Sequence, residues 1–149
     1  STPLCPLRVE AGTEWDMFGV EGAIGVNFAN RFLGGGVLRF GAVQEEVLVL
    51  QCPEIVAVMT MMGKMTDAEA MQILNLRRFN KTSGYGKNIQ PIPPSPSSSS
   101  PTPPQTISIT CIDATKFPAK HSPLECTHAS ILRELRKAMA GFIQRGEEE

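Results

Sequence analysis

Three stretches of the chain have the apolar patterns of strands. Residues 23–29, AIGVNFA, alternate well enough to predict one strand, and MQILNL at 71–76 predicts a short second one. Further on, ISITCID begins at Ile107, is rich in β-branched residues and predicts a buried strand. These segments are the predicted strands of a sheet.

Helical patterns separate the predicted strands. Val43, Val47 and Leu50 recur at helical spacing, but the run VLVL also suits a strand, so periodicity leaves this segment open. Pro53 suits the first turn of a helix over PEIVAVMTMM, with Glu54 near the positive end of the helix dipole.

The last predicted helix, from Ser130, has the clearest pattern. Its charged positions, 133, 134, 136 and 137, oppose one apolar stripe, as in an amphipathic helix. The stripe consists of Ile131, Leu132, Leu135, Ala138, Met139 and Phe142.

Strands that alternate with helices predict a layered α/β fold with a mostly parallel sheet. The stretch PIPPSPSSSSPTPP interrupts this pattern, because proline lacks an amide hydrogen and the serines have nothing to bury. We expect one domain over residues 1–149, interrupted by a disordered Pro/Ser-rich insert at about 91–104.

Composition excludes several classes of function. A net charge of −1 gives no overall attraction to nucleic acid or to an anionic membrane, and no apolar run reaches the ~20 residues of a membrane span. The four cysteines are far apart, and we interpret them as reduced thiols of an intracellular protein. Cys126, His121 and His128 lack a fourth ligand at a familiar zinc spacing, so we expect no metal.

The candidate chemistry lies in NFANRFLGGGVLRFGAVQEEV, from Asn27 to Val47, which leaves the end of the first predicted strand. In α/β sheets, ligands bind beyond the carboxyl ends of strands. Gly34, Gly35 and Gly36 can adopt positive φ and bring backbone amides close to a diphosphate or a ribose. A glycine triplet by itself is also typical of a flexible turn.

Glu45 and Glu46 follow Gln44 at or just inside a predicted helix start, where Glu is also common for dipole reasons alone. Adjacent side chains diverge by about 100° on a helix and about 180° on a strand, so both acids cannot aim at one atom. One could hold a hydroxyl while the other donates a proton, a division that suits glycosidic bond cleavage. Each carboxylate also raises the other's tendency to keep its proton.

The same segment resembles the signature of poly(ADP-ribose) glycohydrolases, a glycine triplet followed within several residues by Gln-Glu-Glu. Other segments are similar to that family in the same order: CPE at 52–54, SGYG at 83–86, ITCIDA at 109–114 and RELRKAMAGF at 133–142. The resemblance extends from about Leu4 to Phe142 with the insert excluded.

The resemblance implies a macrodomain-like, three-layer α/β/α fold with a mixed, mostly parallel sheet. It implies hydrolysis of ribose–ribose O-glycosidic bonds in poly(ADP-ribose), without metal or cofactor. Glu46 would be the general acid/base, and Glu45 would bind ribose hydroxyls beside the scissile bond. The residues expected to contact the substrate are Asn30, Gly34, Gly35, Gly36, Gln44 and Tyr85, with Tyr85 on the adenosine side.

The implied partners are poly(ADP-ribose), ADP-ribose and ADP-ribosylated proteins. Direct nucleic-acid binding and membrane binding are not expected. The implied state is a monomer acting in the nucleus, the cytoplasm or both.

Two departures from the family keep other hypotheses open. Asn27, a third candidate catalytic residue, stands where the family carries an acid, so one like-charge neighbour of the general acid is missing. Family members also continue past the helix near Phe142 into a second glycine-rich loop, so we expect a macrodomain that is incomplete at its C-terminus. The alternatives are a module that binds ADP-ribose without catalysis and a truncated fragment without function.

Overall fold

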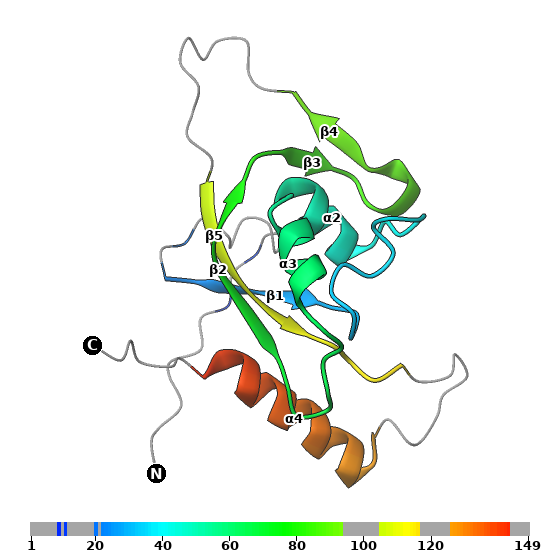
Figure 1. Ribbon diagram of the computed structural model, residues 1–149, viewed down its shortest axis with the longest axis vertical. Helices are drawn as coiled ribbons and strands as arrows, with labels where there is room; N and C mark the ends of the chain where they lie inside the picture. The colour runs from blue at the N-terminus through cyan, green and yellow to red at the C-terminus, as the bar shows by residue number, and fades with distance from the viewer. Residues whose placement is uncertain are drawn as a thin grey trace.

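A computed structural model describes residues 22–93, 105–116 and 126–143 of the chain, together with Val9, Ala11 and Val20 (Figure 1). The elements in chain order are β1 (Ile24–Phe28), α2 (Gln44–Gln51), α3 (Ile55–Met61), β2 (Met71–Arg78), β3 (Lys81–Ser83), the short 3-10 helix η1 (Gly86–Asn88), β4 (Gln90–Ile92), β5 (Gln105–Ile112) and α4 (His128–Phe142).

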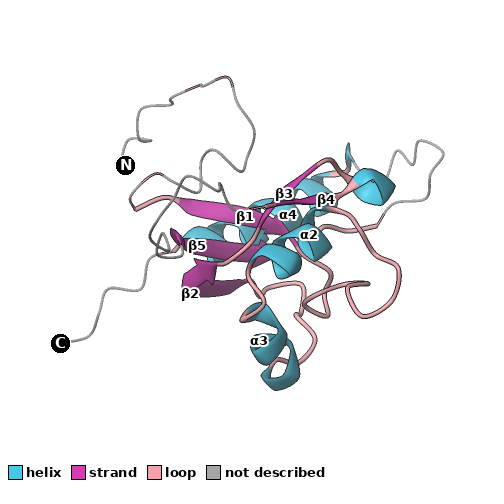
Figure 2. Cartoon of the chain, turned by 90° about the horizontal axis from the view of Figure 1, so that it is seen from above, coloured by secondary structure: helices cyan, strands magenta, loops and turns pink. Residues whose placement is uncertain are grey.

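Three strands form one sheet, in the order β1-β5-β2 (Figure 2). β1 runs parallel to β5, with Asn27 opposite Cys111, whereas β2 runs antiparallel to β5, with Ile73 opposite Ile109. All three predicted strands are therefore present. Within the described residues the sheet is mixed, with one parallel and one antiparallel pairing.

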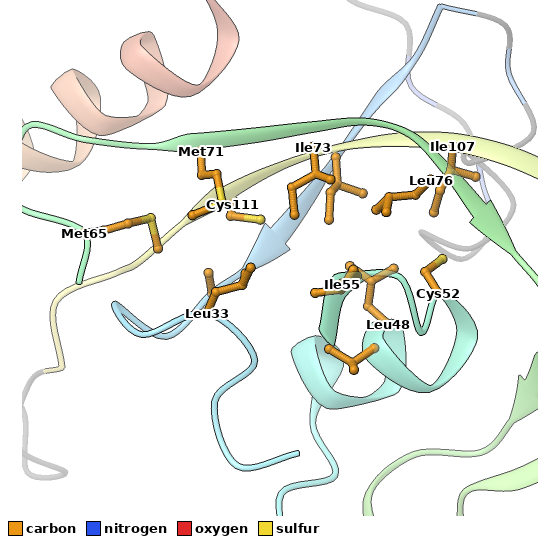
Figure 3. Packing of buried hydrophobic residues seen from close by; sticks show 13 residues of the cluster. Leu33, Leu48, Cys52, Ile55, Met65, Met71, Ile73, Leu76, Ile107 and Cys111 are labelled. Carbon is orange, nitrogen blue, oxygen red and sulfur yellow. The ribbon is translucent and has the colours of Figure 1, made fainter. Parts of the chain in front are cut away.

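The main core lies between this sheet and helices α2 and α3 (Figure 3). Alternate residues of β5 point toward those helices, as the two-residue period of a strand requires. Ile109 and Cys111 are fully buried on this face, beside Leu48 and Ile55 of the helices. The segment that periodicity left open, around VLVL, is the helix α2.

The other face of β5 carries α4. A Cβ atom added to Gly141 would lie 2.6 Å from Thr110 Oγ1 and 2.9 Å from Ile112 Cδ1, so the helix backbone lies directly on the strand. Thr110 and Ile112 alternate with the core residues of β5, which places α4 on the opposite face from α2 and α3.

The charged side of α4 is the side that reaches inward. The Lys137 ammonium is completely buried and donates to the Asp113 carboxylate and, at 2.9 Å, to the Thr66 carbonyl. The apolar stripe of the sequence prediction is present but does not cover the described core: Ile131, Leu135, Met139 and Phe142 are all about half exposed or more. A buried carboxylate at the end of β5 requires a cation, and this requirement decides the orientation of α4.

The hairpin of β3 and β4 was not predicted from the sequence. Gln51 attaches it to α2, because its Nε2 donates to Thr82 Oγ1 at 2.7 Å. β4 includes Pro91 and Ile92, the first residues of the stretch at about 91–104 that the sequence analysis expected to be an insert. A proline is tolerated in such an edge strand. Residues 94–104 lie outside the described residues.

The close approach of α4 to β5 predicts that Gly141→Ala destabilises the chain. Overpacking costs ~1–3 kcal/mol, whereas alanine in a helix regains about 1 kcal/mol over glycine. We expect a net loss of roughly 1 kcal/mol in the free energy of unfolding, measured in urea. Gly63→Ala is the control, since a Cβ there meets nothing within 4 Å. An equal or higher stability of Gly141→Ala would contradict this packing.

Candidate active site

The site is built where the chain leaves the carboxyl end of β1 and returns into α2. The intervening loop, residues 29–43, contains the glycine triplet and folds over the first turn of α2. A pocket of about 550 Å³ lies beyond the carboxyl ends of the parallel strands β1 and β5, where the sequence predicts a ligand site. Its lining residues are Ala29, Asn30, Arg31, Phe32, Asp113, Ala114, Thr115 and Lys116.

The Glu45 carboxylate holds the start of this loop. Oε2 accepts a hydrogen bond from the Asn30 amide at 2.9 Å, and Oε1 accepts one from the Gly34 amide at 2.8 Å. Only 3% of the residue is exposed. A buried carboxylate is costly unless it is hydrogen-bonded, and here two backbone amides supply the bonds.

The Glu46 carboxylate holds the end of the same loop. Oε1 accepts from the Gly36 amide at 2.8 Å, and Oε2 accepts from the Val43 amide at 2.9 Å. The second bond is half of a capping box, in which the third residue of a helix reaches back to the N-cap amide. The two acids therefore diverge, as adjacent positions on a helix must, and each binds a different part of the loop.

The amides of the glycine triplet have hydrogen-bond partners within the chain. Gly34 and Gly36 donate to the carboxylates, and Gly35 donates to the Phe32 carbonyl at 3.3 Å, while the expected approach of this loop to a diphosphate or ribose stays a prediction. All three amides thus hold the loop itself. Glycine is needed at 34 and 35, where φ is +91° and +50°.

Gln44 and Tyr85 join the helix start to its neighbours. Gln44 Oε1 accepts from the Phe28 amide at 2.8 Å, and its Nε2 donates to the Val26 carbonyl at 2.7 Å, so this side chain extends the hydrogen bonding of β1. The Tyr85 hydroxyl accepts from the Gln44 amide at 3.0 Å and caps α2, while about half of Tyr85 is exposed. Their contacts with a sugar and with adenosine stay predictions.

Asn27 lies beneath Glu45 and is only 1% exposed. Its Nδ2 donates to Cys111 Sγ at 3.4 Å, and its Oδ1 has no hydrogen-bond partner among the described residues. Burial raises the pKa of the Cys111 thiol to about 11, so this neighbour is neutral at physiological pH. Asn27 also donates a hydrogen bond to the Glu45 carboxylate, and its predicted catalytic role stays a prediction.

The pKa of Glu45 is raised above its ordinary value. Burial is the largest cause, and the negative charge of Glu46 adds to it. The hydrogen bonds from Asn30, Gly34 and Asn27 act in the opposite direction without cancelling the effect of burial. Glu45 therefore keeps a proton to a higher pH than a free glutamic acid does.

A charged cluster that the sequence analysis did not single out reaches the pocket through Asp113, one of its lining residues. Asp113 follows β5 directly, is buried, and pairs with Lys137 and, at 3.2 Å, with Arg133. Arg133 also binds Asp67 at 2.9 Å. One pattern in the sequence could have identified this cluster. An aspartate directly follows a predicted buried strand, and an Arg and a Lys lie one turn apart on a later predicted helix.

The described part of the chain holds no group of three or more His, Cys, Asp or Glu side chains placed to bind a metal ion. Within the same residues, no helix is both long and apolar enough to cross a membrane. His121 lies outside the described residues.

The fold and the loop–helix site define a macro-domain type of α/β protein. The family described as Poly (ADP-ribose) glycohydrolase (PARG), Macro domain fold, matches residues 1–149. The chain belongs to the poly(ADP-ribose) glycohydrolase family.

Three relatives illustrate the similarity. Poly(ADP-ribose) glycohydrolase 1 of Caenorhabditis elegans is 36% identical over 134 residues, which cover 81% of this chain and 17% of the relative. Poly(ADP-ribose) glycohydrolase 2 of the same organism is 33% identical over 82% of this chain and 27% of the relative. Poly(ADP-ribose) glycohydrolase 1 of Arabidopsis thaliana is 34% identical over 83% of this chain and 22% of the relative. The chain thus spans between 17% and 27% of the length of these relatives.

The contact between Gly35 and the carboxylates predicts a large effect of Gly35→Ala. The added Cβ would lie 2.7 Å from both Glu45 Oε2 and Glu46 Oε1, at a positive φ. We expect a loss of roughly 2–4 kcal/mol in the free energy of unfolding, because overpacking adds to the backbone strain. Gly22→Ala is the matched control, with φ +74° and nothing within 4 Å, and should lose ~1–2 kcal/mol. Equal losses would show that the carboxylates do not restrict this position.

The raised pKa of Glu45 predicts a pH-dependent difference in stability between the wild-type chain and Glu45→Gln. A raised folded-state pKa contributes stability that is fully present below the unfolded value, near 4.5, and is lost as pH rises through the folded-state pKa. From neutral pH downward, the wild-type chain should therefore gain stability relative to Glu45→Gln, by at most about 1.4 kcal/mol per pH unit. Urea unfolding across this range measures the difference. A difference that is constant, or that falls with acidification, would refute the shift.

Proposed function

We propose that this chain is the site-bearing part of a poly(ADP-ribose) glycohydrolase, which hydrolyses ribose–ribose O-glycosidic bonds and releases ADP-ribose. The observation that carries the proposal is the pair of buried, diverging carboxylates of Glu45 and Glu46 at the start of α2. The names of the relatives and of the family support the choice of substrate.

In the proposed reaction, Glu46 is the general acid/base. It gives its proton to the leaving ribose oxygen as an oxocarbenium-like centre develops, and then takes a proton from the water that attacks that centre. Each of its oxygens accepts one backbone amide and has a further lone pair that can face the substrate. The fixed amides keep the carboxylate oriented for transfer.

Glu45 has the other role in this proposal, binding ribose hydroxyls beside the scissile bond. Asn30 and Gln44 would contact sugars, Gly34–Gly36 would lie along the ribose and phosphates, and Tyr85 would line the adenosine side. The half-exposed ring of Tyr85 and the exposed Asn30 are accessible to such a ligand.

We infer no metal or other cofactor for this chemistry. The proposed partners are poly(ADP-ribose), ADP-ribose and ADP-ribosylated proteins, bound by a monomer in the nucleus, the cytoplasm or both. The helices on both faces of the sheet support a three-layer α/β/α arrangement, and we extend it to a mostly parallel sheet in the whole domain.

A second candidate is an ADP-ribose-binding module without catalysis. Asn27 motivates it, because this buried residue replaces an acid of the family and brings no charge next to Glu45. Calorimetry with ADP-ribose, combined with a turnover assay, separates the two candidates. Binding without turnover favours the module.

The proposal predicts that Glu46→Gln lowers the release of ADP-ribose from automodified polymerase by about 10²–10⁴-fold, the usual contribution of a general acid/base. ADP-ribose affinity should change little, which shows that the loop is retained. Glu45→Gln is the matched control and should raise KM more than it lowers kcat. Release by Glu46→Gln at the wild-type rate would rule out Glu46 as the general acid/base. A loss of kcat confined to Glu45→Gln would instead assign that role to Glu45.

A further inference from the structure

The pocket beyond β1 and β5 contains two cations that have no close partner among the described residues. Arg31 Nη2 lies 3.7 Å from Asp67 Oδ1 and 3.7 Å from Asp113 Oδ2, beyond hydrogen-bonding distance, and 44% of its side chain is exposed. Lys116 is exposed and forms no hydrogen bond or ion pair within the described part of the chain. Among the described residues, Arg31 is held only by these two long ion pairs, and both side chains are exposed enough to meet a ligand.

The carboxylates near these cations are already neutralised by others. Asp113 is paired with Lys137 and Arg133, and Asp67 with Arg133. Glu134 accepts from Arg133 at 2.7 Å and from the Thr115 hydroxyl at 3.1 Å. Among the residues that line the pocket, Arg31 and Lys116 are cationic and Asp113, which is paired with Lys137 and Arg133, is the one carboxylate, so the lining favours an anion.

The other lining residues narrow the chemistry of that anion. Phe32 is 59% exposed, and an exposed ring beside a guanidinium is suited to a nucleotide, with its base stacked and its phosphates bound. Asn30 belongs to the same lining, and its amide donates to Glu45. The pocket therefore adjoins the candidate catalytic carboxylates directly.

The two carboxylates lie between this pocket and Tyr85. Glu45 is bound to Asn30 of the pocket, whereas Glu46 is bound to Val43, next to the residue capped by the Tyr85 hydroxyl. In Figure 1 the hairpin that leads to Tyr85 lies on one side of α2 and the ends of β1 and β5 lie on the other. A bond cleaved between the carboxylates would join one unit beside Tyr85 to a second unit in the pocket.

We propose that the pocket binds the next ADP-ribose unit of the polymer, across the scissile bond from the unit beside Tyr85. Arg31 and Lys116 pair with its diphosphate, and Phe32 lies against its nucleoside. This inference rests on the proposed function, since it assumes a polymer with a bond between two units. It explains how the chain would distinguish a polymer from free ADP-ribose.

The test compares affinities for ADP-ribose and for a short poly(ADP-ribose) of defined length, by fluorescence anisotropy. The full chain carries Glu46→Gln, so that the polymer stays intact. Arg31→Gln should weaken polymer binding by about tenfold, as expected for one lost bond to a charged group, and leave ADP-ribose affinity unchanged. Arg31→Lys should recover part of the loss. Lys116→Gln should act in the same direction.

Arg39→Gln is the matched control. It removes the same charge from the same loop, at an exposed residue whose side chain forms no hydrogen bond or ion pair among the described residues, and should leave both affinities within about twofold of the parent chain. Added salt should reduce the preference for polymer in the parent chain more than in Arg31→Gln.

Each outcome decides one proposal. Equal polymer affinities of Arg31→Gln and Arg39→Gln overturn the inference, and so does an equal loss for polymer and ADP-ribose, which would place the terminal unit in the pocket. Failure of both ligands to bind overturns it as well. Absence of turnover by the wild-type chain, with the Arg31 effect on polymer binding present, overturns the proposed hydrolysis and supports the pocket.

Discussion

The site depends on two buried carboxylates that accept the backbone amides of the loop lying over them. Glu45 and Glu46 are 3% and 5% exposed, and neither could be buried at the start of a helix without donors. The donors are the amides of Asn30, Gly34, Gly36 and Val43. The loop thus makes burial of the acids possible, and the acids give the loop its single conformation. Glycine is required because its backbone contacts the carboxylate oxygens directly.

This arrangement connects stability with the proposed chemistry. The helix start favours negative charge on these side chains, while burial raises the pKa of Glu45, the residue proposed to bind ribose hydroxyls beside the general acid/base Glu46. The charges around Asp113 fix the neighbouring strand end and α4, and among the described residues they leave Arg31 with only two long ion pairs of 3.7 Å. The pocket and the carboxylates then lie side by side, as two adjoining units of a polymer require.

Part of this could be predicted from the sequence. The β-branched run from Ile107 and the apolar alternation at 23–29 identify strands that do form, whereas periodicity left the segment of α2 open between a helix and a strand. The hydrogen-bond acceptors of the glycine amides could not be predicted. A glycine triplet indicates which backbone angles are permitted, but it does not indicate which groups the amides bind. The assignment of specific roles to Glu45 and Glu46 came from the family resemblance and not from the pattern.

The orientation of α4 and the β3–β4 hairpin depend on tertiary contacts, which the hydrophobic pattern of the sequence does not predict. Lys137 belongs to the polar side of the helix by spacing, yet it is fully buried because Asp113 requires a cation. Thr82 and Pro91 lie in strands of three residues that have no periodicity to detect, and the hairpin is attached by Gln51 from a distant part of the chain.

The most direct measurement is amide hydrogen exchange, resolved by residue, in the wild-type chain and in Glu46→Gln. We expect slow exchange at Gly34, Gly36 and Val43 in the wild-type chain, although they belong to a surface loop. In Glu46→Gln, exchange should accelerate at Gly36 and Val43, while Gly34, bound to Glu45, stays protected. Fast exchange of all three amides in the wild-type chain would contradict the claim that the carboxylates hold the loop.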